Sequence, residues 1–350
     1  MARITILGAG FMGSALTFPA TDNGHQVALW GTWLDDHLVE AVRRGEPHPK
    51  LRLPLPPGVR VHPHTQLAEA LSGADLVVNA VTSEGTLPVL TRAFPHLAPG
   101  TPLMSVSKGL LRRRTGRVDT ISAAIVDRLP RSLRREFPLV VVGGPSKAME
   151  LARRVPTAVC YASTDPMTSR RAQGMFQRPY YSIREIADVR GLEVCSAFKN
   201  AYAIAIGLCD GLAKAGRWEA ITNTKAALFA QAIGEMEILV RSVRGDVATV
   251  LGLPAVGDLF VTGVAGRNRA FGEMRGSGMP THKVVAELSA RDELTEGYAA
   301  IRMGGAFARQ RRLRGLPLLE ALYRIVYRGA DVERELGRVV HSNRAKRRGS

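Results

Sequence analysis

Near its N-terminus the chain reads Arg3-Ile4-Thr5-Ile6-Leu7-Gly8-Ala9-Gly10-Phe11-Met12-Gly13. The apolar run predicts a strand, and a helix-favouring stretch follows the glycines. In a dinucleotide-binding turn Gly8 would permit the tight turn, Gly10 would let a pyrophosphate approach the backbone, and Gly13 would allow close helix–strand packing. The helix N-terminus would add N–H groups and a positive dipole. A packing turn without a ligand is the alternative, but the place between strand and helix favours a dinucleotide site that includes Phe11 and Met12.

The first half of the chain alternates short apolar runs with helix-like stretches. The strands that we predict are Arg3–Leu7, Gln26–Leu29, Leu76–Ala80, Pro102–Ser105, Leu139–Val142 and Thr157–Tyr161. The helices that we predict between them are Met12–Asn23, Leu67–Leu71, Leu87–Phe94, Val118–Leu129 and Lys147–Arg153. Continuous apolar strands separated by helices are typical of a parallel sheet covered on both faces. We therefore predict an α/β Rossmann-type doubly wound sheet, closed by a short pair of strands around Tyr180–Ile183.

From about Gly191 the chain becomes rich in Ala and Leu with helical spacing. The helices that we predict there are Val194–Ala213, Thr222–Val243, Val284–Leu288, Glu296–Gln310 and Leu318–Tyr327. The Gly-rich piece Gly252–Gly278 predicts a long ordered loop with a functional role. We thus expect a Rossmann-type dinucleotide-binding domain over residues 1–190, an all-α substrate and catalytic domain over 191–340, and a basic, flexible tail over 341–350.

The 350-residue chain carries 48 Lys and Arg against 31 Asp and Glu, a net charge of +17. The basic residues are mostly arginine and are spread along the chain, and neither zinc-finger spacing nor an aromatic RNA-binding strand accompanies them. We therefore expect no dedicated nucleic-acid partner. A positive surface would instead attract anionic small molecules.

The three cysteines are odd in number, widely spaced and in apolar contexts, which indicates buried thiols in a reducing compartment. We see no apolar run as long as a membrane span and no signal-peptide layout, so we expect a cytoplasmic protein without a membrane partner. His62 and His64 lack an acidic or cysteine partner nearby, so we predict no metal site.

The residues after the second strand bear on which dinucleotide binds. An Asp or Glu there would grip a ribose 2′-hydroxyl, and an Arg would favour a 2′-phosphate. Leu29-Trp30 is followed by Gly31-Thr32-Trp33, while Asp35 and Asp36 come later and fit the next helix. Thr32 is a cofactor candidate. The choice between NAD and NADP stays open, with NADP slightly favoured because the carboxylate is missing.

An ammonium and a carboxamide, Lys199 and Asn200, stand in the apolar helical run Glu193–Gly207. A buried ammonium is costly unless it is paired or its pKa falls, and such a lysine can exchange a proton near neutral pH. A lysine that extends from a core helix to solvent is the alternative.

Two further motifs follow predicted strands of the sheet. Ser107-Lys108-Gly109 places Lys108 at a strand end, where it is either a loop lysine or a ligand contact. Gly143-Gly144-Pro145-Ser146-Lys147-Ala148 is a turn before a helix. Ser146 is well placed as its N-cap, and the alternative is backbone and hydroxyl contact with a ligand.

The helical half holds another group of polar residues. Asp258 and Thr262 are four apart and share a helix face, so Asp258 could orient a lysine ammonium and Thr262 could bind a substrate hydroxyl. Arg267, beside Asn268, carries a fork that matches phosphate oxygens, although a surface loop arginine is the common case. Glu296 is either functional or a favourable carboxylate at a helix N-terminus.

In this order the motifs resemble NAD(P)-dependent glycerol-3-phosphate dehydrogenase, from Gly8 to about Gly329. The resemblance also rests on Leu192-Glu193, Phe198-Lys199-Asn200, Gly257-Asp258-Leu259, Arg267-Asn268 and Glu296-Gly297. It implies a general acid/base at Lys199, supporting residues at Lys108, Asp258 and Thr262, and a phosphate-binding pair at Arg267 and Asn268, with Arg267 bordering the cofactor. It also implies a second ligand loop at Gly144, Ser146 and Ala148, and late cofactor contacts at Leu294 and Glu296.

This chain departs from the family pattern at Phe11-Met12, Gly31-Thr32, Lys147 and Gly266, while the positions that match the catalytic residues are intact. The resemblance implies hydride transfer between NAD(P)H and dihydroxyacetone phosphate, giving sn-glycerol 3-phosphate for glycerophospholipid synthesis, in a homodimer. Asn200 and Asp258 would hold Lys199. Two alternatives remain: a dehydrogenase of the same build that acts on another phosphorylated ketone or on a hydroxy acid, and a non-catalytic dinucleotide-binding regulator.

Overall fold

The computed structural model describes residues 1–134, 137–291, 293 and 296–341. It divides into two compact units, residues 1–193 and residues 194–350. Helix α9 (Val189–Lys214) runs through the border. Most of the predicted flexible tail, from residue 342 on, lies outside the described residues.

The first unit contains an eight-stranded sheet among its described residues, in the order β10-β9-β8-β5-β4-β1-β2-β3. The strands are β1 (Arg3–Leu7), β2 (Gln26–Trp30), β3 (Arg60–His62), β4 (Leu76–Asn79), β5 (Leu103–Ser105), β8 (Leu139–Gly143), β9 (Thr157–Ala162) and β10 (Tyr181–Ile186). In this order the six neighbouring strands β8, β5, β4, β1, β2 and β3 are parallel. The chain builds the sheet outward from β1, first on one side and then on the other. This arrangement confirms the predicted doubly wound sheet.

Strand β9 departs from the predicted parallel pattern, because it runs antiparallel to β8. Its connection contains only the five-residue helix α7 (Ala148–Ala152). A β9 parallel to β8 would require the chain to return along the whole of the five-residue β8, which is about 16 Å, whereas a helix of five residues spans only about 7.5 Å. The eleven-residue helix α8 (Pro166–Phe176) is long enough, and β10 accordingly runs parallel to β9.

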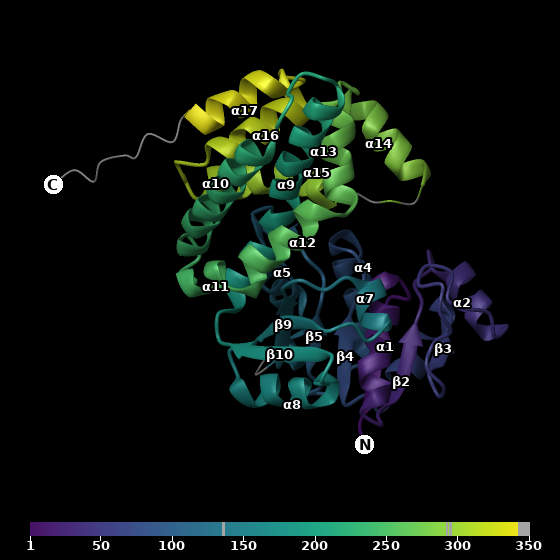
Figure 1. The fold of residues 1–350 in the computed structure, drawn as a ribbon. Helices are drawn as coiled ribbons and strands as arrows, with labels where there is room; N and C mark the ends of the chain where they lie inside the picture. The colour runs from purple at the N-terminus through teal and green to yellow at the C-terminus, as the bar shows by residue number, and fades with distance from the viewer. Residues whose placement is uncertain (135–136, 292, 294–295, 342–350) are drawn as a thin grey trace. The chain divides into compact units, whose positions relative to one another are not determined.

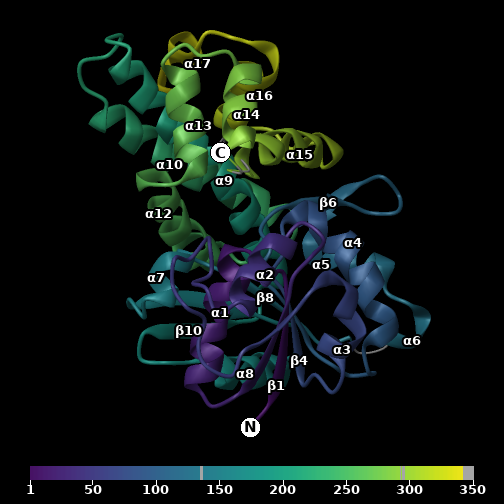
Figure 2. The ribbon, with the colours of Figure 1, turned by 90° about the vertical axis from the view of Figure 1, so that its right-hand side faces the viewer.

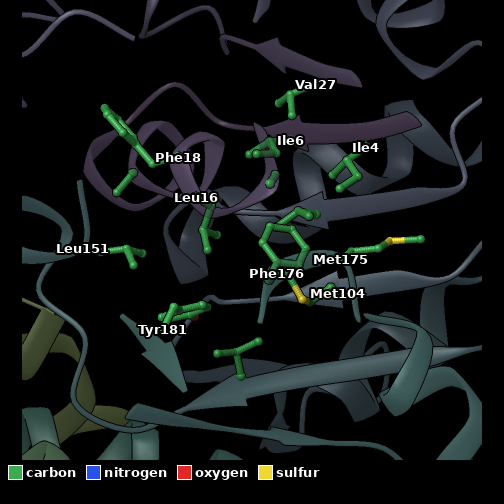
Figure 3. Packing of buried hydrophobic residues seen from close by; sticks show 14 of the residues in the cluster. Ile4, Ile6, Leu16, Phe18, Val27, Met104, Leu151, Met175, Phe176 and Tyr181 are labelled. Atoms are coloured by element: carbon green, nitrogen blue, oxygen red, sulfur yellow. The ribbon is translucent and has the colours of Figure 1, made fainter. Parts of the chain in front are cut away.

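Helices cover both faces of the sheet, as Figure 2 shows. The other helices of the first unit are α1 (Phe11–Asp22), α2 (Asp36–Arg43), η1 (His64–Gln66), α3 (Leu67–Leu71), α4 (Ser83–Ala93), η2 (Phe94–His96), α5 (Ile121–Arg128) and α6 (Arg131–Arg134). One apolar cluster joins the sheet to α1, α7 and α8, and Figure 3 shows part of it around Leu16, Phe176 and Tyr181. A second cluster joins the opposite face to α3, α4 and α5.

The predicted helix Val118–Leu129 is wrong in its first turn. Val118–Thr120 is strand β7, which pairs antiparallel with β6 (Leu110–Arg112) in a hairpin. Helix α5 begins only after Thr120, whose hydroxyl accepts the N–H of Ala123 as an N-cap. Short β3 and helices α6 and α8 were not among the predicted elements, and α2 was expected only as the helix that Asp35 and Asp36 fit.

The second unit is helical throughout its described residues. Besides α9 its helices are α10 (Thr222–Arg241), α11 (Val247–Leu251), η3 (Leu253–Gly257), α12 (Asp258–Val264), α13 (Arg267–Gly276), α14 (Thr281–Ala290), α15 (Glu296–Gln310), α16 (Pro317–Arg328) and α17 (Val332–His341). Figures 1 and 2 show α9 beside α10, α13 and α15. This confirms the predicted helical second part.

Helix α9 is long and apolar enough to meet the length and composition of a membrane span, contrary to our expectation that no apolar run would do so. Its most apolar 18-residue window has a mean hydropathy of 1.2, and all of that window is buried inside the protein. Full burial of this kind is typical of a core helix.

The Gly-rich piece Gly252–Gly278 is not the long loop that we predicted, because it folds into η3, α12 and α13. Its glycines permit close helix packing: a Cβ on Gly272 would lie 2.2 Å from the carbonyl oxygen of Ile204, and one on Gly276 2.3 Å from that of Leu208. From the other side, a Cβ on Gly207 would lie 2.0 Å from the carbonyl oxygen of Arg269. The backbones of α9 and α13 therefore touch through glycines on both helices.

Replacing Gly272 with alanine tests this contact. The new methyl group would force the two backbones apart, so we expect Gly272→Ala to lower the free energy of unfolding by about 1–3 kcal/mol. Gly234→Ala is the matched control, because Gly234 lies in α10 and a Cβ added there would have no neighbouring atom within 4 Å. There alanine should raise stability by up to about 1 kcal/mol. Urea unfolding would measure both, and equal effects would contradict the contact.

Candidate active site

The glycine turn of the first unit has the geometry that its sequence predicts. Gly8 has a φ of +111°, which favours glycine, and a Cβ on Gly13 would lie 1.9 Å from the carbonyl oxygen of Gly8. At Gly10, in contrast, the space around a Cβ is open for 4 Å. Helix α1 follows at once, with no acidic residue in its first turn. The turn thus leaves room for an anion in front of a helix N-terminus.

Asp35 and Asp36 stand at the start of α2, as expected, but the side chain of Asp35 turns back toward the glycine turn. Asp35 precedes α2, and its Oδ2 accepts hydrogen bonds from the backbone N–H of Thr32 (2.9 Å), the hydroxyl of Thr32 (2.8 Å) and the N–H of Ala9 (3.4 Å). The slight preference for NADP rested on a missing carboxylate, so it loses its basis. The predicted cofactor candidate Thr32 is buried, and its hydroxyl hydrogen is directed to Asp35.

The two ligand loops predicted after β5 and β8 lie side by side. The two strands are neighbours in the sheet, so their carboxyl ends meet at one edge. Lys108 Nζ donates a hydrogen bond to the carbonyl oxygen of Gly144 at 3.0 Å. Gly144 has a φ of +113°, a conformation that side chains rarely adopt. The structure therefore brings Lys108 and Gly144 together at the edge where a doubly wound sheet binds its ligands.

Ser146 is not the N-cap that its position suggested. Helix α7 begins at Ala148, and Lys147 stands at its N-cap. The hydroxyl oxygen of Ser146 is buried without a hydrogen-bond partner in the described part of the chain. An orphaned buried hydroxyl costs free energy unless a ligand or water satisfies it. This observation removes the capping explanation and favours contact with a ligand.

Asn79 organises this edge and was missed in the sequence. It is fully buried at the end of β4, and its Nδ2 donates to the hydroxyls of Ser105 (3.1 Å) and Ser107 (2.9 Å). Ser107 donates in turn to the carbonyl oxygen of Val81 at 2.6 Å. These bonds fix the loop that carries Lys108. A lone carboxamide at the end of an apolar strand was the available signal.

In the second unit Lys199 is buried and paired. Its Nζ donates to Asp258 Oδ1 and to Thr262 Oγ1, each at 2.9 Å. Asp258 is 1% exposed, and the Lys199 side chain is 9% exposed. The hydroxyl of Thr262 donates to the carbonyl oxygen of Asp258 at 2.6 Å, so it faces Lys199 with a lone pair. This geometry excludes a lysine that extends to solvent.

Asn200 belongs to a second, adjoining network. Its Nδ2 donates to Glu296 Oε2 at 2.9 Å, and its Oδ1 accepts from Asn268 Nδ2 at 2.9 Å. Asn268 Oδ1 then accepts the N–H of Gly297 at 2.8 Å. Asn200 therefore ties α9 to α13 and α15, and the expectation that it holds Lys199 is wrong for a direct hydrogen bond. The predicted residue Glu296 is thus a hydrogen-bond partner of Asn200.

Arg267 opens α13 and is exposed. Within the described ranges no hydrogen bond or ion pair engages its guanidinium, whereas Asn268, the next residue, is buried. An exposed arginine at a helix N-terminus matches the needs of a phosphate group. The predicted cofactor residue Leu294 lies outside the described residues, and predicted Ala148 is the first residue of α7.

The two units offer different polar groups. The first offers a glycine turn before a helix, a lysine and an orphaned hydroxyl, which fit a dinucleotide. The second offers a buried lysine with a carboxylate and a hydroxyl, beside an exposed arginine. In the described ranges no group of three or more His, Cys, Asp or Glu residues could hold a metal ion.

Comparison with known proteins identifies the family. The model of the NAD-dependent glycerol-3-phosphate dehydrogenase N-terminus matches residues 3–169, and that of the C-terminus matches residues 188–336. The NADP(+)-dependent glycerol-3-phosphate dehydrogenase of Archaeoglobus fulgidus is 34% identical over 95% of this chain and 97% of its own length. Glycerol-3-phosphate dehydrogenase [NAD(P)+] of Desulfitobacterium hafniense is 33% identical over 95% of this chain and 89% of its own.

A solved structure agrees with these relatives. Glycerol-3-phosphate dehydrogenase of Coxiella burnetii superposes with a TM-score of 0.85 at 27% identity, covering 97% of this chain and 98% of that one. The resemblance stated from the motifs is thereby confirmed. The chain belongs to the NAD-dependent glycerol-3-phosphate dehydrogenase family.

Proposed function

We propose that the protein interconverts dihydroxyacetone phosphate and sn-glycerol 3-phosphate, with NADH or NADPH as the hydride carrier. The observation that carries the proposal is the buried Lys199, held by Asp258 and Thr262 in a chain of this family. A hydroxy-acid dehydrogenase is not favoured, because the relatives at 30% identity or more are named for glycerol 3-phosphate.

Lys199 acts as the general acid in the reduction. The bound cofactor supplies the hydride. The Lys199 ammonium donates a proton to the ketone oxygen and, in the reverse direction, the amine takes it back from the hydroxyl. Asp258 and Thr262 both accept from Nζ, so they fix the position of the ammonium before substrate arrives. Preorganisation of this kind lowers the barrier because no group has to reorient during proton transfer.

Arg267 binds the phosphate of the substrate, and Asn268 sets the position of Arg267. The guanidinium offers a planar fork that matches two phosphate oxygens, and the N-terminus of α13 adds positive potential. Asn268 is anchored by Asn200 and Gly297, so the start of α13 is fixed. The net charge of +17 favours the approach of an anionic substrate.

The first unit holds the cofactor. The glycine turn and α1 bind the pyrophosphate. The buried hydroxyl of Ser146 and the ammonium of Lys108 contact the ligand from the loops after β8 and β5. Lys108 also orients the substrate and stabilises negative charge on its oxygen. The carboxylate of Asp35, at the start of α2 and beside the glycine turn, suits a ribose hydroxyl, so we propose that NADH is used as well as NADPH.

We also propose a cytoplasmic homodimer that supplies sn-glycerol 3-phosphate for glycerophospholipid synthesis. All three cysteines are free and buried, which is typical of a reducing compartment. Light scattering coupled to size-exclusion chromatography would test the dimer.

The decisive experiment follows NADH and NADPH oxidation with dihydroxyacetone phosphate, and in parallel with ketopantoate. We expect turnover of the phosphorylated ketone with both cofactors, and little with the keto acid. Faster turnover of the keto acid would overturn the proposed substrate. Tight NAD(P)H binding without any turnover would instead support a dinucleotide-binding regulator.

Removing the Lys199 amine should abolish proton transfer but spare cofactor binding. We expect Lys199→Ala to lower kcat by about 10²- to 10⁴-fold, with the Kd of NAD(P)H changed little. Lys199→Arg is the sharper variant, because it keeps a positive partner for Asp258 but cannot give up a proton near neutral pH. Near-normal kcat in Lys199→Arg would contradict the general-acid role.

Arg267→Ala should act on substrate binding. Loss of a charged hydrogen bond is worth about 1.5–3 kcal/mol, so we expect the KM for dihydroxyacetone phosphate to rise about 10- to 100-fold. Arg241→Ala serves as the control, since it removes the same charge from an exposed site on α10. Equal changes in both variants would show an effect of net charge alone.

A further inference from the structure

Behind the glycine turn lies a histidine that the proposed reaction does not use. His48 follows α2 in a tight loop, where its N–H donates to the carbonyl oxygen of Leu53 at 2.9 Å and its carbonyl oxygen accepts the N–H of Arg52 at 2.7 Å. The side chain is 0% exposed. Complete burial of an imidazole is costly unless both ring nitrogens are satisfied.

Both nitrogens have partners, and the partners determine the tautomer. Nδ1 accepts the N–H of Leu51 at 3.3 Å, so the ring hydrogen belongs on Nε2. Nε2 lies 2.9 Å from the carbonyl oxygen of Ala9 and 3.0 Å from Ser14 Oγ. The hydroxyl of Ser14 itself donates to the same carbonyl oxygen at 3.2 Å. The neutral imidazole therefore donates directly to the glycine turn.

Ala9 is the residue between the first two glycines of that turn, and both its backbone polar groups are held from outside. Its carbonyl oxygen is bound by His48 and Ser14, and its N–H donates to Asp35. Because the flanking glycines have wide conformational freedom, the turn needs such external bonds to keep one conformation. The orientation of the Ala9–Gly10 peptide decides where the following N–H groups point.

We infer that His48 is a positioning residue for the dinucleotide: its neutral imidazole, held at Nδ1 by Leu51, keeps the Ala9 carbonyl in place so that the glycine turn can receive the pyrophosphate, and its protonation breaks the bond from Leu51 that holds the ring there. This inference rests on the proposed dinucleotide-binding function. A second proton on the ring would sit at Nδ1, opposite the N–H of Leu51, so two donors would face each other. The hydrogen bond from Leu51 would then be lost and the ring would be pushed away from Leu51, so that Nε2–H, still a donor, would no longer hold the Ala9 carbonyl in the same position.

The surroundings of His48 favour the neutral form. Burial lowers the pKa of His48, Lys50 in the same loop and His37 on α2 lower it further, and Asp35 opposes them. The hydrogen bond to Ala9 also acts in the opposite direction. Helix α1 contributes no acidic side chain in its first turn, and its N-terminus repels a cation. Cofactor affinity is thus constant above the pKa of His48 and falls as pH drops below it.

Two variants of the same chemistry and different length test the assignment. In His48→Gln the carboxamide nitrogen reaches the place of Nε2, but the group does not titrate. In His48→Asn the amide is one methylene too short to reach the Ala9 carbonyl. His25→Gln is the control, because burial lowers the pKa of His25 as well, and its Nδ1 accepts from the N–H of Ala2, remote from the turn.

The measurement is the Kd of NADPH and NADH for the full chain by nucleotide fluorescence, from about pH 8 down through the ordinary histidine pKa of about 6.5. A thermal melt at each pH keeps acid unfolding separate, since a lowered histidine pKa also removes stability as pH falls through the unfolded value. We expect the wild type and His25→Gln to lose affinity toward acid pH, and His48→Gln to hold a flat profile. His48→Asn should bind about tenfold more weakly at neutral pH, the equivalent of one lost hydrogen bond of about 1.4 kcal/mol.

Three outcomes would overturn the assignment: an acid loss in His48→Gln that matches the wild type, wild-type affinity in His48→Asn, or a wild-type Kd that does not change with pH. If His48→Asn does not fold, the comparison of His48→Gln with His25→Gln decides alone. In steady-state turnover the His48→Asn defect should raise the KM for the cofactor and leave kcat at saturating cofactor nearly unchanged. Intact cofactor binding without turnover of dihydroxyacetone phosphate would refute the proposed reaction and leave the role of His48 standing.

Discussion

The close contact between the backbones of α9 and α13 is the constraint on which the helical unit depends. Gly207 and Gly211 on one helix, and Gly272 and Gly276 on the other, leave no room for a Cβ. Only at that distance can a short carboxamide on α9, Asn200, hydrogen-bond directly to one on α13, Asn268. The glycines lower the helix propensity of both segments. In return, the close packing fixes the distance between the helix that carries Lys199 and the helix that opens with Arg267.

Around Lys199 a buried ion pair, rather than close backbone packing, fixes the geometry. Burial of an ammonium and a carboxylate is unfavourable for each alone, and their 2.9 Å contact, together with the second acceptor that Thr262 supplies, helps to compensate. The pair is then held in one geometry but is a weak source of stability. On the sheet edge, Asn79 and Ser107 play the corresponding part for Lys108 by hydrogen bonds between neutral groups.

Much of this arrangement could be predicted because the relevant patterns are local. Strand, glycine turn and helix follow one another within a few residues, and the spacing of Asp258 and Thr262 places both on one helix face. The contacts that could not be predicted join distant residues. Gly272 reads as a loop residue until Ile204 is seen against it, and Ser146 reads as a cap until α7 is seen to begin at Ala148. Asp35 reads as part of α2, because sequence order does not show that its side chain turns back to Ala9.

Asp35 also limits how coenzyme choice in this protein could be redesigned. In dinucleotide-binding folds an acidic group after the second strand favours a ribose 2′-hydroxyl over a 2′-phosphate, so its removal is the direct way to admit the phosphate. Here one oxygen of that carboxylate holds the N–H of Ala9, together with the backbone and hydroxyl of Thr32. A neutral replacement would therefore weaken the bonds that hold Ala9 and Thr32. If Asp35 were changed to alter coenzyme choice, the conformation of the glycine turn would need compensation elsewhere.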